Sequence, residues 1–233
     1  QLLPIYDKPL IFYPLSVLML AGIKDILIIV NEGQLKQFKK ILPDGKNLGV
    51  KISFAIQKYP KGLPEALTIG EKFIGKDNVA LILGDNFFYG QGIENTLVEA
   101  SIKGRNTIFS YKVKNPKDYG VVKFNKKRKA IKLIEKPNKF ISNYAVSGIY
   151  FYDNKVVEYA KKLKKSSRGE LEITDLNKIY LKKNNLDVRI FGRGVAWLDA
   201  GTPEKLLEAS EFVKTIENRQ GFKIACLEEI SLR

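Results

Sequence analysis

The sequence predicts an α/β protein with a largely parallel sheet covered by helices on both faces. Over the first half of the chain, short apolar runs rich in β-branched residues alternate with segments of helical spacing. This alternation is typical of βαβ units. The 233 residues, 45% of them hydrophobic, are enough to bury a core. We expect one domain over residues 1–218, with 219–233 as the start of a further, truncated helical segment.

Strands and helices are predicted in turn through the first half. The strands are 25–30, 50–57, 79–83 and 107–113, and the helices are 34–42, 65–74 and 93–102. The runs 25–30 and 79–83 are nearly continuous and apolar, as expected for strands buried on both faces. The first helix stops at Pro43-Asp44-Gly45, and Pro64 suits the first turn of the second helix.

The second half differs in pattern. Segments 119–124 and 130–135 flank a polar, basic stretch and predict a two-stranded ribbon. A strand at 143–152, helices at 155–163 and 173–181, a strand at 188–191 and a helix at 203–216 follow. The last helix has a clear start, because Thr202 can cap it, Pro203 suits its first position and Glu204 complements the helix dipole.

Composition excludes several kinds of chemistry. The chain has no histidine, which excludes Ser-His-Asp and Cys-His catalysis within it, and the single Cys226 excludes an internal disulfide. The lone cysteine also favours a reducing, cytoplasmic location. The net charge of +15 comes mainly from dispersed lysines, which favours a solvated surface over a nucleic-acid site. No apolar run is long enough to predict a membrane span.

Two aspartates carry the first functional hypothesis. Asp85 closes the apolar run 78–85, and Asp199 closes the run 194–199. In open α/β sheets, ligands bind at the carboxyl ends of strands, where two such carboxylates can share a hard cation such as Mg²⁺. Either aspartate alone is equally consistent with a carboxylate that caps a following turn, and the pair together favours a metal.

Other candidates lie on loops and strand ends. Gln57 ends a strand and can read a nucleobase edge, and Gly62 lets a ligand approach the backbone near a helix start. Glu135 and Lys136 end the ribbon and suit sugar hydroxyls and a phosphate, and Arg168 precedes a helix and suits a phosphate. On spacing alone, each is also explained as an ordinary surface or loop residue.

Taken in order, the motifs resemble one family over essentially the whole chain. They are Gln1–Pro9, Leu83–Asn86, Tyr119–Val122, Glu135–Pro137, Ser142–Val146, Arg168–Thr174 and Gly192–Thr202. The set is similar to the bacterial-type glucose-1-phosphate thymidylyltransferases. The resemblance implies a three-layer α/β/α, Rossmann-like nucleotide-diphospho-sugar transferase fold with a mixed, mostly parallel sheet that lacks its first strand. It also implies a Mg²⁺-dependent reaction of dTTP with glucose 1-phosphate that gives dTDP-glucose and pyrophosphate, carried out by a homo-oligomer.

The resemblance also assigns roles to residues. It implies that Asp85 and Asp199 bind the metal and, with Lys136 and Arg168, form the catalytic set. Gln57 and Gly62 would contact thymine, and Gln1 and Asn86 would line the nucleotide and sugar site. The glucose contacts would be Gly120, Glu135 and Val146.

Several features of the family are not found in this sequence. A first strand, a Gly-x-Gly-Thr-Arg phosphate loop and a catalytic lysine would precede Gln1, and further helices would follow the region of Arg233. The family's Gly-Leu-Ala-Gln reads Gly62-Leu63-Pro64-Glu65, and Ala200 replaces a common threonine. The alternatives are a pyrophosphorylase for another nucleotide such as UTP, a non-catalytic nucleotide- or RNA-binding module, and a truncated chain that is inactive.

Overall fold

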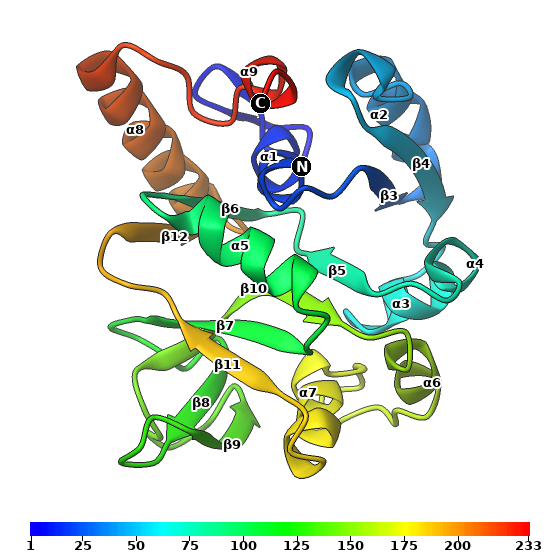
Figure 1. The fold of residues 1–233 in the computed structure, drawn as a ribbon, viewed down its shortest axis with the longest axis vertical. Coiled ribbons are helices and arrows are strands. Elements are labelled where there is room, and N and C mark those ends of the chain that lie inside the picture. The colour runs from blue at the N-terminus through cyan, green and yellow to red at the C-terminus, as the bar shows by residue number, and fades with distance from the viewer.

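A six-stranded mixed sheet forms the centre of the molecule (Figure 1). The computed structural model describes residues 1–233. The strands are β5 (Val79–Ile82), β7 (Thr107–Lys112), β8 (Gly120–Phe124), β9 (Ala130–Glu135), β10 (Tyr144–Tyr152) and β11 (Asp187–Ile190). Their order is β11–β7–β10–β8–β9, and β5 pairs with β10.

The predicted α/β class with a mixed sheet is confirmed, and β10 explains why the pairing is less parallel than the sequence suggests. β11 is parallel to β7, whereas β10 is antiparallel to β5, β7 and β8. β5 and β7 therefore share a direction, but they do not pair, because β10 lies between them. The antiparallel β8–β9 ribbon leads the chain into β10, which runs against its neighbours.

Helices cover both faces of this sheet. β10 is buried on both sides, with Ala145, Ile149 and Phe151 in one cluster and Val146, Tyr150 and Tyr152 in the other. The first cluster also holds residues of α1 (Phe12–Leu20) and α5 (Ile93–Ile102). The second holds residues of α3 (Glu65–Ile69), α6 (Val156–Lys161) and α7 (Ile173–Lys182). The alternation of strand side chains thus produces the expected three layers.

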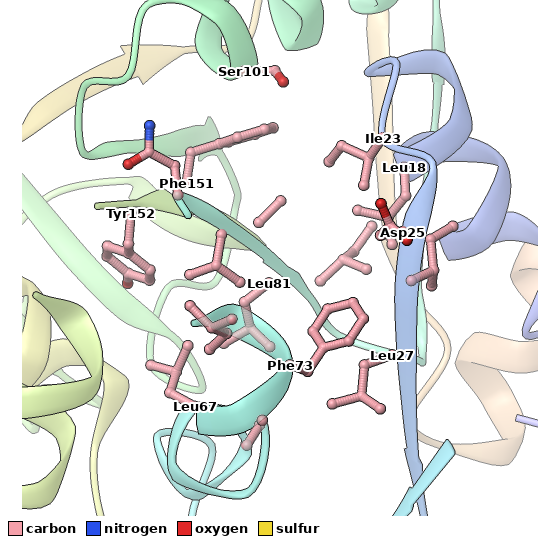
Figure 2. A pocket seen from close by; sticks show the side chains of 18 of the residues that line it. Leu18, Ile23, Asp25, Leu27, Leu67, Phe73, Leu81, Ser101, Phe151 and Tyr152 are labelled. Carbon is pink, nitrogen blue, oxygen red and sulfur yellow. The ribbon is translucent and has the colours of Figure 1, made fainter. Parts of the chain in front are cut away.

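A second, smaller sheet is separated from the first by an apolar cleft. β3 (Asp25–Val30) pairs in parallel with β4 (Lys51–Ile56), and α2 (Leu35–Ile41) packs beside them. The cleft between β3 and β5 has a volume of about 200 Å³, with Leu27 and Phe73 on one side and Leu81 on the other (Figure 2). Neither β3 nor β5 has a partner strand on this side, in agreement with the expected sheet without a first strand.

Several elements are not anticipated by the sequence patterns. These are the short hairpin β1 (Pro4–Ile5) and β2 (Lys8–Pro9), helix α1, and strand β6 (Asn86–Gly90), which pairs with β12 (Val195–Asp199). The predicted helix at 65–74 is divided at Gly70 into α3 and α4 (Glu71–Ile74), as expected for a residue of low helix propensity. Two short 3₁₀ turns, Glu32–Gln34 and Lys46–Leu48, flank α2.

The last helices bring the end of the chain back to its beginning. α8 (Pro203–Gln220) is longer than predicted, and α9 (Leu227–Ser231) places the buried Leu227 in one cluster with Leu15 of α1. In Figure 1 these helices and α1 lie at the end of the molecule opposite the β8–β9 ribbon. No helix is both long enough and apolar enough to cross a bilayer.

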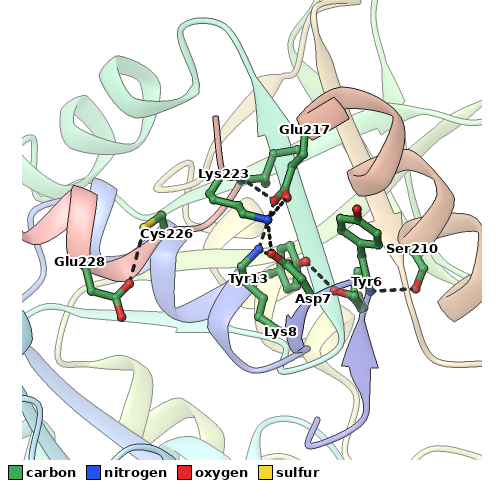
Figure 3. Close-up of polar contacts among 11 residues, drawn as sticks. Tyr6, Asp7, Lys8, Tyr13, Ser210, Glu217, Lys223, Cys226 and Glu228 are labelled. Atoms are coloured by element: carbon green, nitrogen blue, oxygen red, sulfur yellow. Dashed lines mark hydrogen bonds and ion pairs between the residues drawn. The ribbon is translucent and has the colours of Figure 1, made fainter. Parts of the chain in front are cut away.

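A charged network attaches the β1–β2 hairpin to the end of α8 (Figure 3). The buried Glu217 accepts hydrogen bonds from Lys8 Nζ at 3.1 Å, Lys223 Nζ at 2.8 Å and the N–H of Ile224 at 2.9 Å. Lys223 also pairs with Asp7 at 2.6 Å. Every charge in this group has an opposite partner, which is the condition for burying a carboxylate.

Candidate active site

The pairing of β6 with β12 brings the two predicted aspartates together. In this antiparallel pair Asp199 lies opposite Asn86, the residue that follows Asp85. The N–H of Ala200 donates to the carbonyl oxygen of Asp85 at 2.8 Å and fixes the two strand ends side by side. β12 belongs to a separate pair, so the aspartates meet through this pairing and not at a common edge of the central sheet.

The two carboxylates converge over Gly201. A β-carbon at this glycine would lie 2.9 Å from Asp199 Oδ1 and 3.2 Å from Asp85 Oδ2. The N–H of Gly201 donates to Asp199 Oδ1 at 2.9 Å, which orients that oxygen. Two converging carboxylate oxygens fit a hard divalent cation, which takes its other ligands from water and substrate. No group of three or more Asp, Glu, His or Cys side chains with metal-binding geometry is present.

Asn86 is buried beside this pair and orients Asp85. Its Nδ2 donates to Asp85 Oδ1 at 2.8 Å, and its Oδ1 accepts from Trp197 Nε1 at 2.6 Å. Asn86 is 2% exposed, so its amide is committed to protein partners although it borders the pocket. The partners fix the direction of the amide, which in turn fixes the aspartate.

A lysine that the sequence analysis does not identify contacts Asp199. Lys205, in the first turn of α8, places Nζ 2.7 Å from Asp199 Oδ2 and 5.4 Å from the centre of the Tyr119 ring. Partial burial favours the neutral amine, but the hydrogen bond to Asp199 outweighs it, so the pKa of Lys205 is above its usual value. Its position three residues after the Thr202 cap is the only sequence signal that marks it.

Most of the predicted residues line one pocket of about 270 Å³. They are Asp85, Asn86, Gly120, Glu135, Lys136, Val146, Arg168 and Asp199. The topology explains their convergence, because β8 pairs with the first part of one edge of β10 and β5 pairs with its second part. The end of β5 and the start of β8 therefore lie beside Val146. We call this cavity the acidic pocket.

Glu135 presents its carboxylate to the acidic pocket and lies opposite Gly120, the first residue of β8. Its Oε2 accepts a hydrogen bond from Thr174 Oγ1, at the start of α7. A side chain at Gly120 would collide with both groups, since a β-carbon there would lie 2.7 Å from Thr174 Oγ1 and 3.2 Å from Glu135 Oε2. Thr174 is a further site residue; its only signal is its place in the segment that begins at Arg168.

The two predicted phosphate-binding cations differ in their pairing. Arg168 donates to Glu172 through Nε at 3.1 Å and through Nη2 at 2.8 Å, and these bonds raise the pKa of the guanidinium. Lys136 makes no ion pair within 4.0 Å, and its φ of 37° lies in the left-handed region. An unpaired ammonium on a strained backbone at the pocket wall is typical of a ligand-binding position.

The remaining predicted residues line an adjoining pocket of about 660 Å³. They are Gln1, Gln57 and Gly62, and Leu63, Leu83 and Glu170 form a wall shared with the acidic pocket. The chain follows a tight course at Gly62, whose φ is 116° and whose β-carbon would lie 2.2 Å from the carbonyl oxygen of Leu171. We call this cavity the amide pocket.

Glu65, the unusual residue of the Gly62–Glu65 segment, faces away from both pockets. Its carboxylate accepts from Gln57 Nε2 at 2.7 Å and from the N–H of Lys61 at 3.1 Å. Desolvation raises the pKa of Glu65, but the bonds from Gln57 and Lys61 outweigh that effect and leave the pKa below its usual value. The carboxylate therefore orients the Gln57 amide and is not directed at a phosphate.

Comparison with known proteins is consistent with this geometry. A family model described as nucleotidyl transferase matches residues 1–216. The glucose-1-phosphate thymidylyltransferase of Neisseria meningitidis serogroup A is 56% identical over all of this chain and 81% of its own length. The chain belongs to the nucleotidyl transferase family, among the glucose-1-phosphate thymidylyltransferases. The enzyme of that name from Mycobacterium tuberculosis is 51% identical, again over the whole chain and 81% of its own length.

Solved structures of this family share the fold. A glucose-1-phosphate thymidylyltransferase structure from Bacillus anthracis, solved with sucrose, matches with a TM-score of 0.82 and 36% identity over 91% of this chain and 85% of that chain. A UDP-glucose pyrophosphorylase solved with UDP-glucose matches with a TM-score of 0.80 and 25% identity over 92% of this chain and 90% of its own. Nucleotidyltransferases of this family generally use a divalent metal, for which Asp85 and Asp199 are the fitting carboxylates.

Proposed function

We propose that this chain transfers a thymidylyl group from dTTP to α-D-glucose 1-phosphate, giving dTDP-glucose and pyrophosphate, with Mg²⁺ at Asp85 and Asp199. The observation that carries the proposal is the convergence of these two carboxylates over Gly201, at one end of a pocket that also holds Glu135 and Lys136. Sequence identity of 51–56% to named glucose-1-phosphate thymidylyltransferases supports the choice of substrates.

The two adjoining pockets suit the two substrates. In the amide pocket, Gln57 offers Oε1 and one Nε2–H to a base whose edge alternates donor and acceptor, while its other Nε2–H stays on Glu65. Gly62 lines the same pocket, where its missing side chain makes room for the backbone of Leu171, and Gln1 packs against Gly84 in the wall of this pocket. We assign this pocket to the nucleoside.

The acidic pocket suits a sugar phosphate. Glu135 accepts from sugar hydroxyls, and Gly120 and Val146 line the pocket beside it, where they can contact the sugar ring. Lys136 makes no ion pair and can bind a phosphate directly. Arg168 can bind a phosphate when it gives up a carboxylate partner such as Glu172.

The reaction needs no general base, which agrees with a chain that has no histidine. The phosphate oxygen of glucose 1-phosphate, already anionic near neutral pH, forms a bond to the α-phosphorus of dTTP, and the bond from that phosphorus to the bridging oxygen of pyrophosphate breaks. A bound Mg²⁺ would neutralise phosphate charge. Lys136 and Arg168 add positive charge, while Asn86 and the N–H of Gly201 hold the carboxylates in position.

A second candidate function is the same reaction with UTP. The observation that favours this candidate is the shared fold with a UDP-glucose pyrophosphorylase. The sequence identity to that protein is 25%, however, about half of the identity to the thymidylyltransferase of Neisseria meningitidis. Calorimetric titration of the protein with dTTP and with UTP separates the two. Tighter binding of dTTP is expected, and equal affinities would contradict the thymidylyl assignment.

Substitution at Asp199 tests the metal role. Asp199→Asn keeps the shape and the hydrogen bond from Gly201 but removes the charge, so we expect turnover with Mg²⁺ to fall at least 100-fold with little change in thermal unfolding. Unchanged turnover would refute the metal role. A non-catalytic RNA-binding module would instead show strongly salt-dependent RNA binding that survives Asp85→Ala.

Three further expectations belong with this proposal. We propose self-association into a homo-oligomer, as the family resemblance implies, with sedimentation velocity as its measurement. The division into a domain at 1–218 and a helical segment from 219 stays a prediction, as does the cytoplasmic location. α8 continues past position 218, and α9 packs against α1. Deletion of residues 219–233 would test whether residues 1–218 fold by themselves.

A further inference from the structure

Lys205 occupies one oxygen of Asp199 and leaves the other free. Its Nζ lies 2.7 Å from Oδ2, whereas Oδ1 is held by the N–H of Gly201 and converges with Asp85 Oδ2. The two oxygens of one carboxylate thus have different partners. Asp199 can offer only Oδ1 to a cation, because bidentate coordination would require Lys205 to leave.

The position of Lys205 is not explained by its helix. Lys205 lies in the first turn of α8, where the helix dipole disfavours a positive charge. Its backbone N–H is already capped by Thr202 Oγ1, which does not require any particular side chain at 205. The Lys205 ammonium instead lies between Asp199 and the face of Tyr119, with Nζ 3.4 Å from the Tyr119 hydroxyl. These contacts fix the ammonium beside the metal-binding carboxylate.

We infer that Lys205 is a positioning residue that acts as a resident counter-cation of Asp199, holding it monodentate and weakening the binding of free divalent cations to the Asp85–Asp199 pair. This inference rests on the proposed metal site. A site of two carboxylates and one ammonium carries a net charge of −1, so it attracts a free dication less than the carboxylates alone. A cation bound to nucleotide phosphates brings further ligands, so it binds despite the ammonium. Lys205 therefore favours binding of a metal ion that is already bound to the nucleotide.

Binding of Mn²⁺ alone, measured by titration calorimetry without nucleotide, tests the inference. Lys205→Met removes the charge, and we expect Mn²⁺ to bind about tenfold more tightly, the scale of one solvent-screened unit charge acting on a dication. Lys205→Arg keeps the charge and should bind as the unsubstituted protein does. Lys161→Met removes a lysine that pairs with Glu71 on the surface, outside both pockets, and should also change nothing.

The outcomes separate this inference from the proposed function. If Asp85→Asn and Asp199→Asn leave Mn²⁺ binding unchanged, the proposed metal site is wrong. If these two variants lose Mn²⁺ but Lys205→Met binds it no more tightly than the unsubstituted protein, only the role of Lys205 is refuted. Lys205→Gln, which removes the charge but keeps a hydrogen-bond donor for Oδ2, should show the same tightening and gives the readout if the methionine variant does not fold.

Discussion

Single residues decide the geometry of the acidic pocket, and the smallest of them leave the space in which polar groups meet. Gly201 leaves room between two carboxylates, and Gly120 leaves room beside Glu135 and Thr174. Gly201 does not need a left-handed backbone, since its φ is not positive. The site requires glycine at position 201 only for steric and electrostatic reasons, so this requirement can be tested by a substitution that does not strain the backbone.

Gly201→Ala should weaken metal binding while preserving the fold. The new methyl group would lie 2.9 Å from Asp199 Oδ1 and 3.2 Å from Asp85 Oδ2, which fills the position where the two oxygens converge. We expect at least a tenfold loss of Mn²⁺ affinity by calorimetry and a change of less than ~1 kcal/mol in the free energy of unfolding. Gly194→Ala, where a methyl group would meet nothing within 4 Å, is the matched control. Retained affinity in Gly201→Ala would show that the oxygens do not act together.

Glu65→Ala should weaken nucleotide binding and leave the chemical step nearly unchanged. Glu65 fixes the Gln57 amide and the N–H of Lys61, so its loss frees both groups. One charge-assisted hydrogen bond is worth ~1.5 kcal/mol, or about tenfold in affinity. Steady-state kinetics should show a higher KM for dTTP with kcat within about twofold. A fall in kcat at constant KM would place Glu65 in the chemistry instead.

At the scale of elements, α8 connects the site to the N-terminal hairpin. Its first turn begins at the Thr202 cap beside Asp199, and its last turns carry Glu217, which binds Lys8 and Lys223. Burial raises the pKa of Glu217, but the hydrogen bonds from Lys223, Ile224 and Lys8 outweigh burial, so the pKa lies below its usual value. A carboxyl group whose pKa is lowered by folding stabilises the folded state only while it is ionised.

Glu217→Gln should therefore destabilise the protein in a pH-dependent way. At pH 7 the substitution leaves Lys8 and Lys223 with one carboxylate partner fewer, at a cost of ~2 kcal/mol. Because the folded pKa is lowered, this difference should be complete above about pH 4.5 and should shrink as the pH falls through the folded pKa of Glu217. Urea unfolding at a series of pH values measures it.

Glu211→Gln provides the comparison for this experiment. Glu211 lies on an exposed position of the same helix and makes no ion pair. The variant should differ from the unsubstituted protein by less than ~0.5 kcal/mol at every pH. A pH-independent effect of Glu217→Gln would mean that packing, and not the charge, is what Glu217 contributes.

At the scale of the whole molecule, the sheet is interrupted between β3 and β5, and this divides the protein into regions of unequal stability. β10 is buried along its length and paired on both edges, and β7 lies beside it. The β3–β4 pair has no strand partner on the side of the cleft. It is held by its own cluster with α1, α2 and Leu227 of α9.

Native-state hydrogen exchange should resolve these regions. We expect amides of β7 and β10 to exchange only through global unfolding, and amides of β3 and β4 to exchange through a smaller opening at least ~1 kcal/mol lower in free energy. Mass spectrometry of peptides covering 25–30, 51–56, 107–112 and 144–152, at increasing denaturant, measures the difference. Equal opening free energies for all four strands would show that the cleft does not divide the folding unit.

Much of the fold and of the site was predictable from local pattern. The strands at 25–30 and 130–135 and the helix at 93–102 have the predicted bounds, because each has a strong apolar period and clear ends. The pairing of β6 with β12 was not predictable, because Asn86–Gly90 is short and its partner lies more than 100 residues away. Lys205 and Thr174 were missed because their partners Asp199 and Glu135 lie on other elements, and these contacts depend on how those elements pack together.

The sequence by itself determined the α/β class, most helices and strands, the family and the residue types available for chemistry. Apolar periodicity, helix caps and motifs are properties of short segments, so they can be recognised without knowledge of the tertiary contacts. Only the tertiary structure decided that β10 separates β5 from β7, that Asp85 and Asp199 meet through β6 and β12, and that Lys205 holds one oxygen of Asp199. These depend on contacts between different helices and strands, whose geometry is set by the packing of the whole molecule and not by any one segment of it.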